Sequence, residues 1–132
     1  MTAEAQAEAF VRAYTTRRPI RDGSHTASVQ RAAPYASAPL VANLERYADR
    51  DFDELVAAQA KASRPTKVAI ALPSAKQRPA PDTPVRVWRQ ATVTLQVTGN
   101  ATYTYTRHLT VEVQRSDVGA PWMVTRVLGI EE

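Results

Sequence analysis

The sequence has 132 residues, a formal net charge of +4, two histidines and no cysteine. The absence of cysteine excludes disulfides and thiolate metal sites, and two isolated histidines do not predict a metal site, so no metal or other cofactor is expected. No apolar run approaches the roughly 20 residues that a membrane-spanning helix needs. A chain of this length can bury one hydrophobic core, and we expect a single domain over residues 1–132.

The first part of the chain, up to about residue 64, has the pattern of helices. Residues 3–16 favour a helix because they combine high helix propensity with an apolar stripe on one side. The stripe consists of Ala3, Ala7, Phe10, Val11 and Tyr14. Further helices are expected at residues 26–33, after the N-cap Ser37, and at residues 52–62. Asp51 and Glu54 resemble a capping box at the start of the last of these.

Residues 84–114 predict two long antiparallel strands joined by a turn at residues 98–100. Apolar and polar side chains alternate along both strands, which is the pattern of a half-buried sheet. The apolar positions are Val85, Val87, Ala91, Val93, Leu95, Val97, Tyr103, Tyr105, Leu109, Val111 and Val113. A three-residue loop keeps them on one face, and would pair Leu95 with Tyr103 and Thr94 with Thr104. The alternation is interrupted at residues 88–89, where a β-bulge is expected.

Two shorter strands complete the predicted sheet. They lie at residues 67–72 and 121–130, so the sheet extends over about residues 66–131, and a proline-rich loop joins the first strand to the hairpin. Helices followed by strands predict an α+β fold, in which N-terminal helices pack on a curved four-stranded antiparallel sheet.

Arg89 and Arg107 occupy apolar positions of the two long strands. If both point inward, they lie diagonally across the sheet and could hold a carboxylate or phosphate. The alternatives are a bulge that turns Arg89 outward and an internal ion pair between Arg107 and an acidic residue of a helix.

Tyrosines could line a pocket between helices and sheet. The candidates are Tyr14, Tyr103 and Tyr105, with Tyr35 and Tyr47 nearby in the helical part. A phenol in such a pocket could stabilise an enolate, but an isomerase also needs a carboxylate as general base, and the inward strand positions supply none. We therefore expect no catalytic residue, and core packing of the tyrosines is the alternative.

The opposite face of the sheet is a candidate interface. Trp88, Thr92 and Thr94 lie on it, and Trp122 and Met123 of the last strand add apolar surface. Because the last strand is apolar on both faces, we expect it to be central or covered by a partner.

Arg17, Arg18 and Arg21 form a basic patch after the first helix. Such a patch could meet anionic lipid, nucleic acid or an acidic partner, and a solvated helix end is the alternative. Most aromatic residues lie on the buried parity of the strands, so no specific nucleic-acid binding is expected.

Along nearly its whole length the chain resembles the nuclear transport factor 2-like (cystatin-like) superfamily. The segments concerned are AEAFVRAYTT, SVQRAAPYAS before SAPLVANL, VRVWRQATVTLQVTG, YTYTRHLTVEVQR and PWMVTRVLGI. Within that superfamily, the Phe-x-x-x-Tyr of the first helix, the Pro-Tyr-x-Ser corner and the final Trp-x-Val are similar to two groups of extracytoplasmic domains. These belong to TcpC-type conjugation proteins and to the eighth VirB component of type IV secretion systems.

The resemblance implies a non-catalytic assembly or scaffold domain of a conjugative DNA-transfer channel. Its expected partners are other subunits of a membrane-associated complex and a second copy of itself. Membrane attachment is expected only through a segment outside this chain; with such an anchor the domain lies on the extracytoplasmic face, and otherwise in the cytoplasm. The same fold occurs in small enzymes of the polyketide-cyclase or steroid-isomerase kind, and a ligand-binding enzyme with a pocket between helices and sheet is the alternative.

Overall fold

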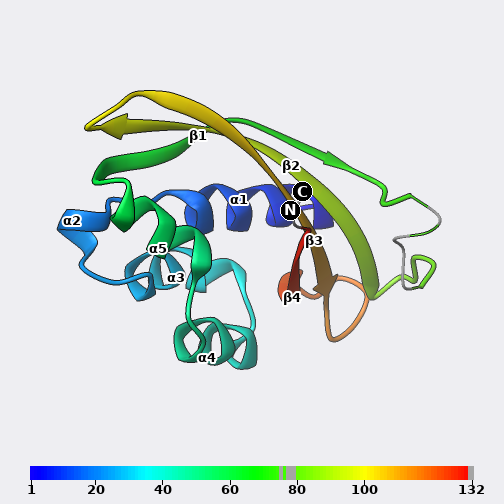
Figure 1. Cartoon of the computed structure of the whole chain (residues 1–132). Helices are drawn as coiled ribbons and strands as arrows, with labels where there is room; N and C mark the ends of the chain where they lie inside the picture. The colour runs from blue at the N-terminus through cyan, green and yellow to red at the C-terminus, as the bar shows by residue number, and fades with distance from the viewer. Residues whose placement is uncertain (75, 77–79, 131–132) are drawn as a thin grey trace.

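The computed structural model describes residues 1–74, 76 and 80–130, with helices first and strands second. The helices are α1 (Ala3–Thr15), α2 (Pro19–Asp22), α3 (Thr26–Ala32), the 3-10 helix η1 (Ala33–Tyr35), α4 (Ala38–Arg46) and α5 (Arg50–Ala57). The strands are β1 (Ala60–Ala71), β2 (Arg86–Gly99), β3 (Tyr103–Gln114) and β4 (Met123–Ile130), which form an antiparallel sheet in that order. The sheet curves over the helices (Figure 1), so the predicted α+β fold is confirmed.

Helix α1 lies along the concave side of the sheet and supplies much of the helical half of the core (Figure 1). It begins after Thr2, whose hydroxyl accepts a hydrogen bond from the N–H of Ala5 at 3.0 Å and satisfies a backbone donor at the helix start. Phe10 and Val11 are fully buried in the same core as Leu95 of the sheet. The predicted apolar stripe is therefore the buried face of this helix.

The two faces of the hairpin are as predicted, but its register is not. Leu95 is fully buried on the helix side, whereas Thr94 is only half-buried on the other face. Leu95 pairs with Tyr105 instead of Tyr103, and Thr94 pairs with Thr106. A shift of two residues keeps every side chain on its predicted face, because successive side chains alternate.

The register differs because β2 continues into the predicted turn as far as Gly99. Gly99 pairs with Ala60 at the start of β1, so it belongs to the sheet and not to the loop. Its φ is +149°, and a Cβ atom there would lie 2.7 Å from the N of Lys61 and 2.8 Å from the O of Gln59. Only glycine permits so close an approach of two backbones at this φ.

The helical part ends earlier than predicted. Helix α5 stops at Ala57, and Gln59 has a positive φ of 57°, which a continuing helix does not allow. Strand β1 then begins at Ala60, so the expected helix over residues 52–62 and the sheet boundary near residue 66 are wrong. Pro65 fits within β1 because this strand is at the edge of the sheet, where a missing N–H costs little.

The predicted bulge at Trp88 and Arg89 is also wrong, because the pairing of β2 with β3 is regular there. Both side chains are accommodated on their own faces instead. Arg89 is 8% exposed and forms ion pairs, and Trp88 is 4% exposed opposite Glu112, which is itself buried. Register shifts occur instead within β1 and beside Glu112 in the pairing of β3 with β4.

The helical layer also holds both edges of the sheet. Arg17 and Ser63 of β1 exchange two backbone hydrogen bonds, each 2.8 Å long. On β4, the O of Val124 accepts a hydrogen bond from the N–H of Ser37 at 2.9 Å. These contacts occupy part of each edge, and they fix the end of α1 and the start of α4 against the sheet.

Candidate functional site

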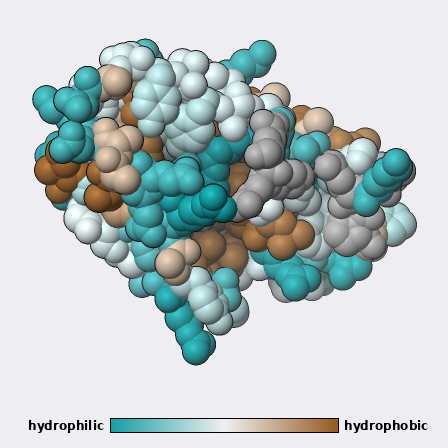
Figure 2. Space-filling model, viewed as in Figure 1, coloured by the Kyte–Doolittle hydropathy of each residue, from teal (hydrophilic) through white to brown (hydrophobic). Residues whose placement is uncertain are grey.

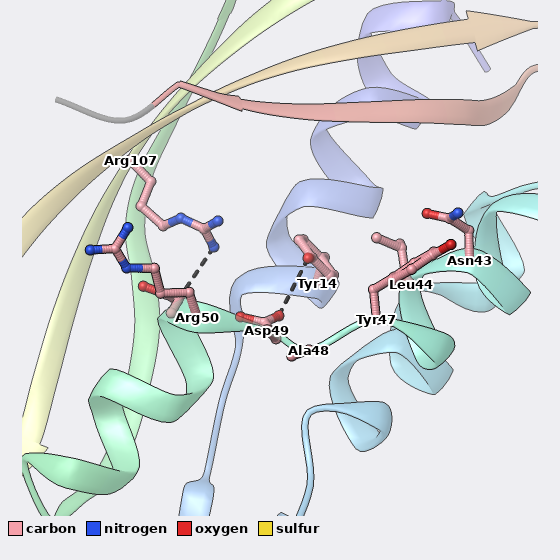
Figure 3. A pocket seen from close by; sticks show the side chains of 9 residues that line it. Tyr14, Asn43, Leu44, Tyr47, Ala48, Asp49, Arg50 and Arg107 are labelled. Carbon is pink, nitrogen blue, oxygen red and sulfur yellow. Dashed lines mark hydrogen bonds and ion pairs between the residues drawn. The ribbon is translucent and has the colours of Figure 1, made fainter.

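A hollow of about 220 Å³ lies between the end of α1, the segment that joins α4 to α5, and β3 (Figure 3). Its walls include Tyr14, Leu44, Tyr47, Asp49, Asp51 and Arg107. Since these side chains come from three separate parts of the chain, the fold is needed to bring them together.

Asp49 connects the end of α1 to the start of α5. Its Oδ2 accepts hydrogen bonds from Arg17 Nη2 at 2.7 Å and from the Tyr14 hydroxyl at 3.4 Å. Its Oδ1 accepts from the N–H of Phe52 at 2.9 Å, so Asp49 is the N-cap of α5 in place of the predicted Asp51.

Arg17 is fully buried and is not part of an exposed basic patch, so that prediction is wrong for this residue. Its Nε donates to the O of Tyr14 at 2.9 Å, and its guanidinium lies 5.0 Å from the centre of the Tyr14 ring. A buried charge is costly unless it is paired, and Asp49 supplies the counter-charge. The exposed basic residues that remain here are Arg18 and Arg21.

Asp51 faces the sheet. Both of its carboxylate oxygens lie 3.2 Å from the Tyr105 hydroxyl, and its Oδ2 lies 3.3 Å from Arg107 Nη1. The Tyr105 oxygen is also 3.4 Å from Ser63 Oγ. Asp51 is therefore the acidic helix residue that the sequence allowed as an internal partner of Arg107.

The contacts around Asp49 and Asp51 favour the protonated forms of Tyr14 and Tyr105 and the ionised form of Asp49. Burial raises the pKa of Tyr105 to about 12, and the negative charge of Asp51 acts in the same direction. Burial and Asp49 also raise the pKa of Tyr14 above its usual value. Burial alone would raise the pKa of Asp49, but the hydrogen bond and charge of Arg17 outweigh it, so this pKa lies below its usual value.

Arg89 does not reach the hollow. Its two terminal nitrogens donate to the two carboxylate oxygens of Asp82 at 2.9 and 2.8 Å, and Nη2 lies 3.4 Å from Glu4 Oε1. In the observed register Val111 stands opposite Arg89, four residues along β3 from Arg107. The predicted diagonal arrangement of the two arginines is therefore wrong, and they belong to different ion pairs.

Of the tyrosines named from the sequence, Tyr14 and Tyr47 line the hollow and Tyr105 supports it through Asp51. Tyr103 is 41% exposed and lies near the hairpin loop. The sequence did not indicate that Asp49 and Asp51, between α4 and α5, line the hollow. Their spacing indicated only the end of one helix and the start of the next. The one local signal was that Asp is a favoured N-cap, which applies to Asp49.

The candidate interface residues on the outer face of the sheet differ in accessibility. Trp88 is buried, so its predicted availability to a partner is wrong. Thr92 and Thr94 are half-buried and lie on the face away from α1. The accessible part of this face therefore presents the hydroxyl groups of Thr92 and Thr94, and the Trp88 side chain is not part of it.

Around β4 the candidate residues lie at an edge of the sheet. Trp122 packs against the core, with the Arg115 guanidinium 4.3 Å from its ring centre, and Met123 Sδ accepts a hydrogen bond from Gln6 Nε2 at 3.9 Å. Leu128 of the same strand is 48% exposed. Because β4 is an edge strand, the central position that its apolar pattern allowed is excluded.

The carboxylates of the hollow belong to Asp49 and Asp51. Both already accept hydrogen bonds from buried partners. Within residues 1–74, 76 and 80–130, no group of three or more His, Cys, Asp or Glu side chains is placed to hold a metal ion. The histidines lie elsewhere, with His25 Nε2 3.0 Å from the O of Leu44 and His108 Nδ1 3.4 Å from Thr92 Oγ1.

Comparison with known proteins relates the chain to one solved structure. No family model matches the sequence, and no curated protein matches it. A match among solved structures is CagV from Helicobacter pylori strain 26695, described as a VirB8 homolog of a type IV secretion system (T4SS). The match has a TM-score of 0.57 and 13% sequence identity, and covers 99% of each chain. At this identity the likeness concerns the fold alone, which the chain shares with this VirB8 homolog, in agreement with the resemblance predicted from the sequence.

Proposed function

We propose that this chain is a non-catalytic assembly domain of a conjugative DNA-transfer apparatus of the type IV secretion kind. The observation that carries the proposal is the correspondence of fold with a VirB8 homolog of a T4SS over 99% of both chains. Since fold does not by itself determine function, the proposal also depends on the surfaces and the hollow described above.

Two surfaces support contact with other subunits or with a second copy. One is the outer edge of the sheet, where Leu128 of β4 is 48% exposed next to the hydroxylated outer face. The other lies at the end of the molecule where α2 is found, and Figure 2 shows hydrophobic residues there. Ile20 and Val56 are 74% and 51% exposed, and Arg18 and Arg21 lie beside Ile20 in the sequence. An exposed apolar patch rimmed by polar or charged residues is typical of a protein contact site.

In this proposal the domain works at the extracytoplasmic face and joins the membrane through a segment outside this chain. Among the described residues, no helix is both long and apolar enough to span a bilayer. Specific nucleic-acid binding is not part of the proposal, because Trp88 is buried and Arg17 is not available to phosphates.

Site-specific photocrosslinking in the source cell tests the proposal. A benzophenone side chain at Leu128 should crosslink to another envelope subunit or to a second copy of the chain. The same group at Val118, which is 68% exposed in a turn, is the matched control and should give far fewer adducts. The proposal is contradicted if Leu128 gives no adduct above the Val118 background and the protein is recovered only from the cytoplasm.

A second candidate is a small-molecule enzyme of the polyketide-cyclase or steroid-isomerase kind. The observation that favours it is the hollow, where a buried Tyr14 with a raised pKa could donate to a ligand oxygen. The engagement of Asp49 and Asp51 in internal hydrogen bonds argues against a free general base. Turnover of a ketosteroid-type substrate that is abolished in Tyr14→Phe would favour this candidate over the assembly role.

A further inference from the structure

The hollow beside α1 contains hydrogen-bond donors that no acceptor within the described residues uses. Arg107 donates to Asp51 through Nη1, at 3.3 Å, and its Nε and Nη2 have no acceptor there. Its side chain is 21% exposed, and Figure 3 shows the guanidinium directed towards the hollow. These two donors therefore remain available to a bound group.

Each carboxylate oxygen of the hollow, in contrast, already accepts a hydrogen bond. Asp49 accepts from Arg17, Tyr14 and the N–H of Phe52. Asp51 accepts from Arg107 and, with both oxygens, from the Tyr105 hydroxyl. A donor or cation bound at these carboxylates would have to compete with these bonds, whereas an acceptor bound at Arg107 Nε and Nη2 would not.

The charges in and behind the walls form two ion pairs, Arg17 with Asp49 and Arg107 with Asp51. Arg17 lies fully buried behind Asp49, and its Nη1 has no hydrogen-bond partner in the described structure. The positive charge of Arg107 also contributes to the lowered pKa of Asp49.

The walls opposite Arg107 are apolar and aromatic. Tyr14 and Leu44 line the hollow, and Tyr47, which is 57% exposed, closes one side (Figure 3). A volume of about 220 Å³ admits a group of the size of an amino-acid side chain. A ligand with an anionic head and a small apolar body would thus bury the exposed Tyr47 ring.

We propose that the hollow binds a carboxylate, which Arg107 receives through Nε and Nη2 while the body of the ligand lies against Tyr14 and Tyr47. A guanidinium presents paired donors that match the two oxygens of a carboxylate, which makes Arg107 the residue that determines the charge of the ligand. The group belongs either to an acidic side chain of a partner protein or to a free small acid. Only the first source depends on the proposed assembly function.

Titration of the isolated protein with phenylacetate, followed by two-dimensional ¹H–¹⁵N NMR, tests the site. Phenylacetate should shift the amide signals of residues 43–51 and 107. Phenylacetamide, which has the same body without the charge, should bind at least roughly tenfold more weakly, because charge-assisted hydrogen bonds are lost. Equal binding of the two compounds, or shifts confined to other surfaces, would overturn the proposal.

Two arginine variants assign the charge to Arg107. Arg107→Gln should weaken phenylacetate binding roughly tenfold or more, whereas Arg64→Gln, the same change at an exposed position of β1, should leave it unchanged. Arg107→Lys keeps a positive charge for Asp51 but loses the planar fork, so it should fold and still bind several-fold more weakly. Unchanged binding in folded Arg107→Lys and Arg107→Gln would contradict the assignment.

The Asp51→Asn variant tests whether Arg107 binds the ligand or only stabilises the fold through its ion pair with Asp51. The negative charge of Asp51 lies next to Arg107 and repels a second carboxylate there, so its neutralisation should strengthen phenylacetate binding several-fold even if it lowers stability. Weaker binding in the folded variant would mean that Asp51 itself holds the ligand, and would overturn the carboxylate proposal.

A peptide distinguishes the two sources of the carboxylate. The sequence Ser-Gly-Leu-Asp-Leu-Gly-Ser with blocked ends should bind at the same signals as phenylacetate if the site serves a partner protein, and its Asn counterpart should not. Binding of phenylacetate without the peptide supports the site and assigns it to a free acid. If neither phenylacetate nor the peptide binds, the proposed carboxylate site is wrong. The assembly function is then still tested independently by crosslinking at Leu128.

Discussion

The ion pair between Arg17 and Asp49 determines how the helical segments meet at the end of α1. Arg17 is fully buried, Asp49 is 8% exposed as a side chain, and the pair is 2.7 Å long. The backbone of Arg17 also bonds to Ser63 at the edge of the sheet, so one residue joins α1, α5 and β1. Loss of one partner would leave the other charged and buried, which is far more costly than loss of an exposed charge.

Arg17→Gln should therefore reduce the free energy of unfolding by roughly 3–5 kcal/mol, as expected for removal of one partner from a buried ion pair. Arg18→Gln, the same change at the adjacent exposed residue, should change it by less than about 0.5 kcal/mol. Urea denaturation of both variants measures the difference. Equal stabilities of the two variants would contradict the buried position of Arg17.

The raised pKa of Tyr105 predicts a loss of stability in alkali. Its folded pKa of about 12 lies above the ordinary tyrosine value of roughly 10, so the unfolded chain releases this proton first. The contribution is fully present below about pH 10 and is lost as the pH rises towards 12. Tyr105→Phe should show a smaller decline in the free energy of unfolding over this range than the wild type, and Tyr103→Phe, at a more exposed position, is the matched control. An identical decline in Tyr105→Phe and the wild type would argue against the buried Tyr105–Asp51 contact.

The sequence could not predict this network at the level of residues. Arg17 and Asp49 are 32 positions apart, and each also fits a simpler interpretation, a solvated charge run for Arg17 and a helix break for Asp49. Tyr14 was recognisable because the periodicity of α1 places it on the buried stripe. Arg107 was recognisable because it is a charged residue at an apolar position of the alternating pattern. Its partner Asp51 could not be identified in this way.

At the level of elements, the alternation of apolar and polar residues determines which face of the hairpin each side chain occupies. The position of the turn is determined by the contact of β2 with β1. Alternation depends only on neighbouring residues, so the faces of β2 and β3 follow from the sequence. The register depends on where β2 leaves the sheet, and Gly99 stays in the sheet because it pairs with Ala60. Likewise, the end of α5 depends on the backbone of Gln59, whose positive φ has no clear sequence signal.

Gly99→Ala should lower the free energy of unfolding by roughly 1–3 kcal/mol, because a Cβ atom would strain the backbone and meet the Lys61 and Gln59 backbone. Gly129→Ala, where a Cβ atom has nothing within 4 Å, should change it by less than about 1 kcal/mol. Thermal and urea denaturation measure both. A neutral effect of Gly99→Ala would show that β1 does not approach β2 in this way.

The two faces of the hairpin predict opposite tolerance to charge. Val93 is fully buried, so Val93→Asp should cost roughly 3–5 kcal/mol by placing an unpaired carboxylate in the core. Thr94→Asp, one residue further along on the half-buried outer face, should cost less than about 1 kcal/mol. Similar midpoints for the two variants in urea would contradict the assignment of faces.

At the scale of the whole molecule, the helices cover the concave face of the sheet and leave three regions open to partners. These are the hollow beside α1, the edge at β4 and the apolar end at α2. The fold could be anticipated because the order of helices and strands and the alternation along β2 and β3 are encoded locally. The hollow could be anticipated only in part, because its acidic side chains are brought to Tyr14 and Arg107 by the packing of α5 against the sheet.

Transfer of DNA from the source strain tests the proposed function most directly. Deletion of the gene for this chain should abolish conjugative transfer without slowing growth, and the wild-type chain supplied from a plasmid should restore it. Arg17→Gln, which we expect to be strongly destabilised, should restore transfer poorly, whereas the stable control Arg18→Gln should restore it fully. Transfer at the wild-type frequency in the deletion strain would contradict the proposal that this domain is an assembly component of a DNA-transfer apparatus.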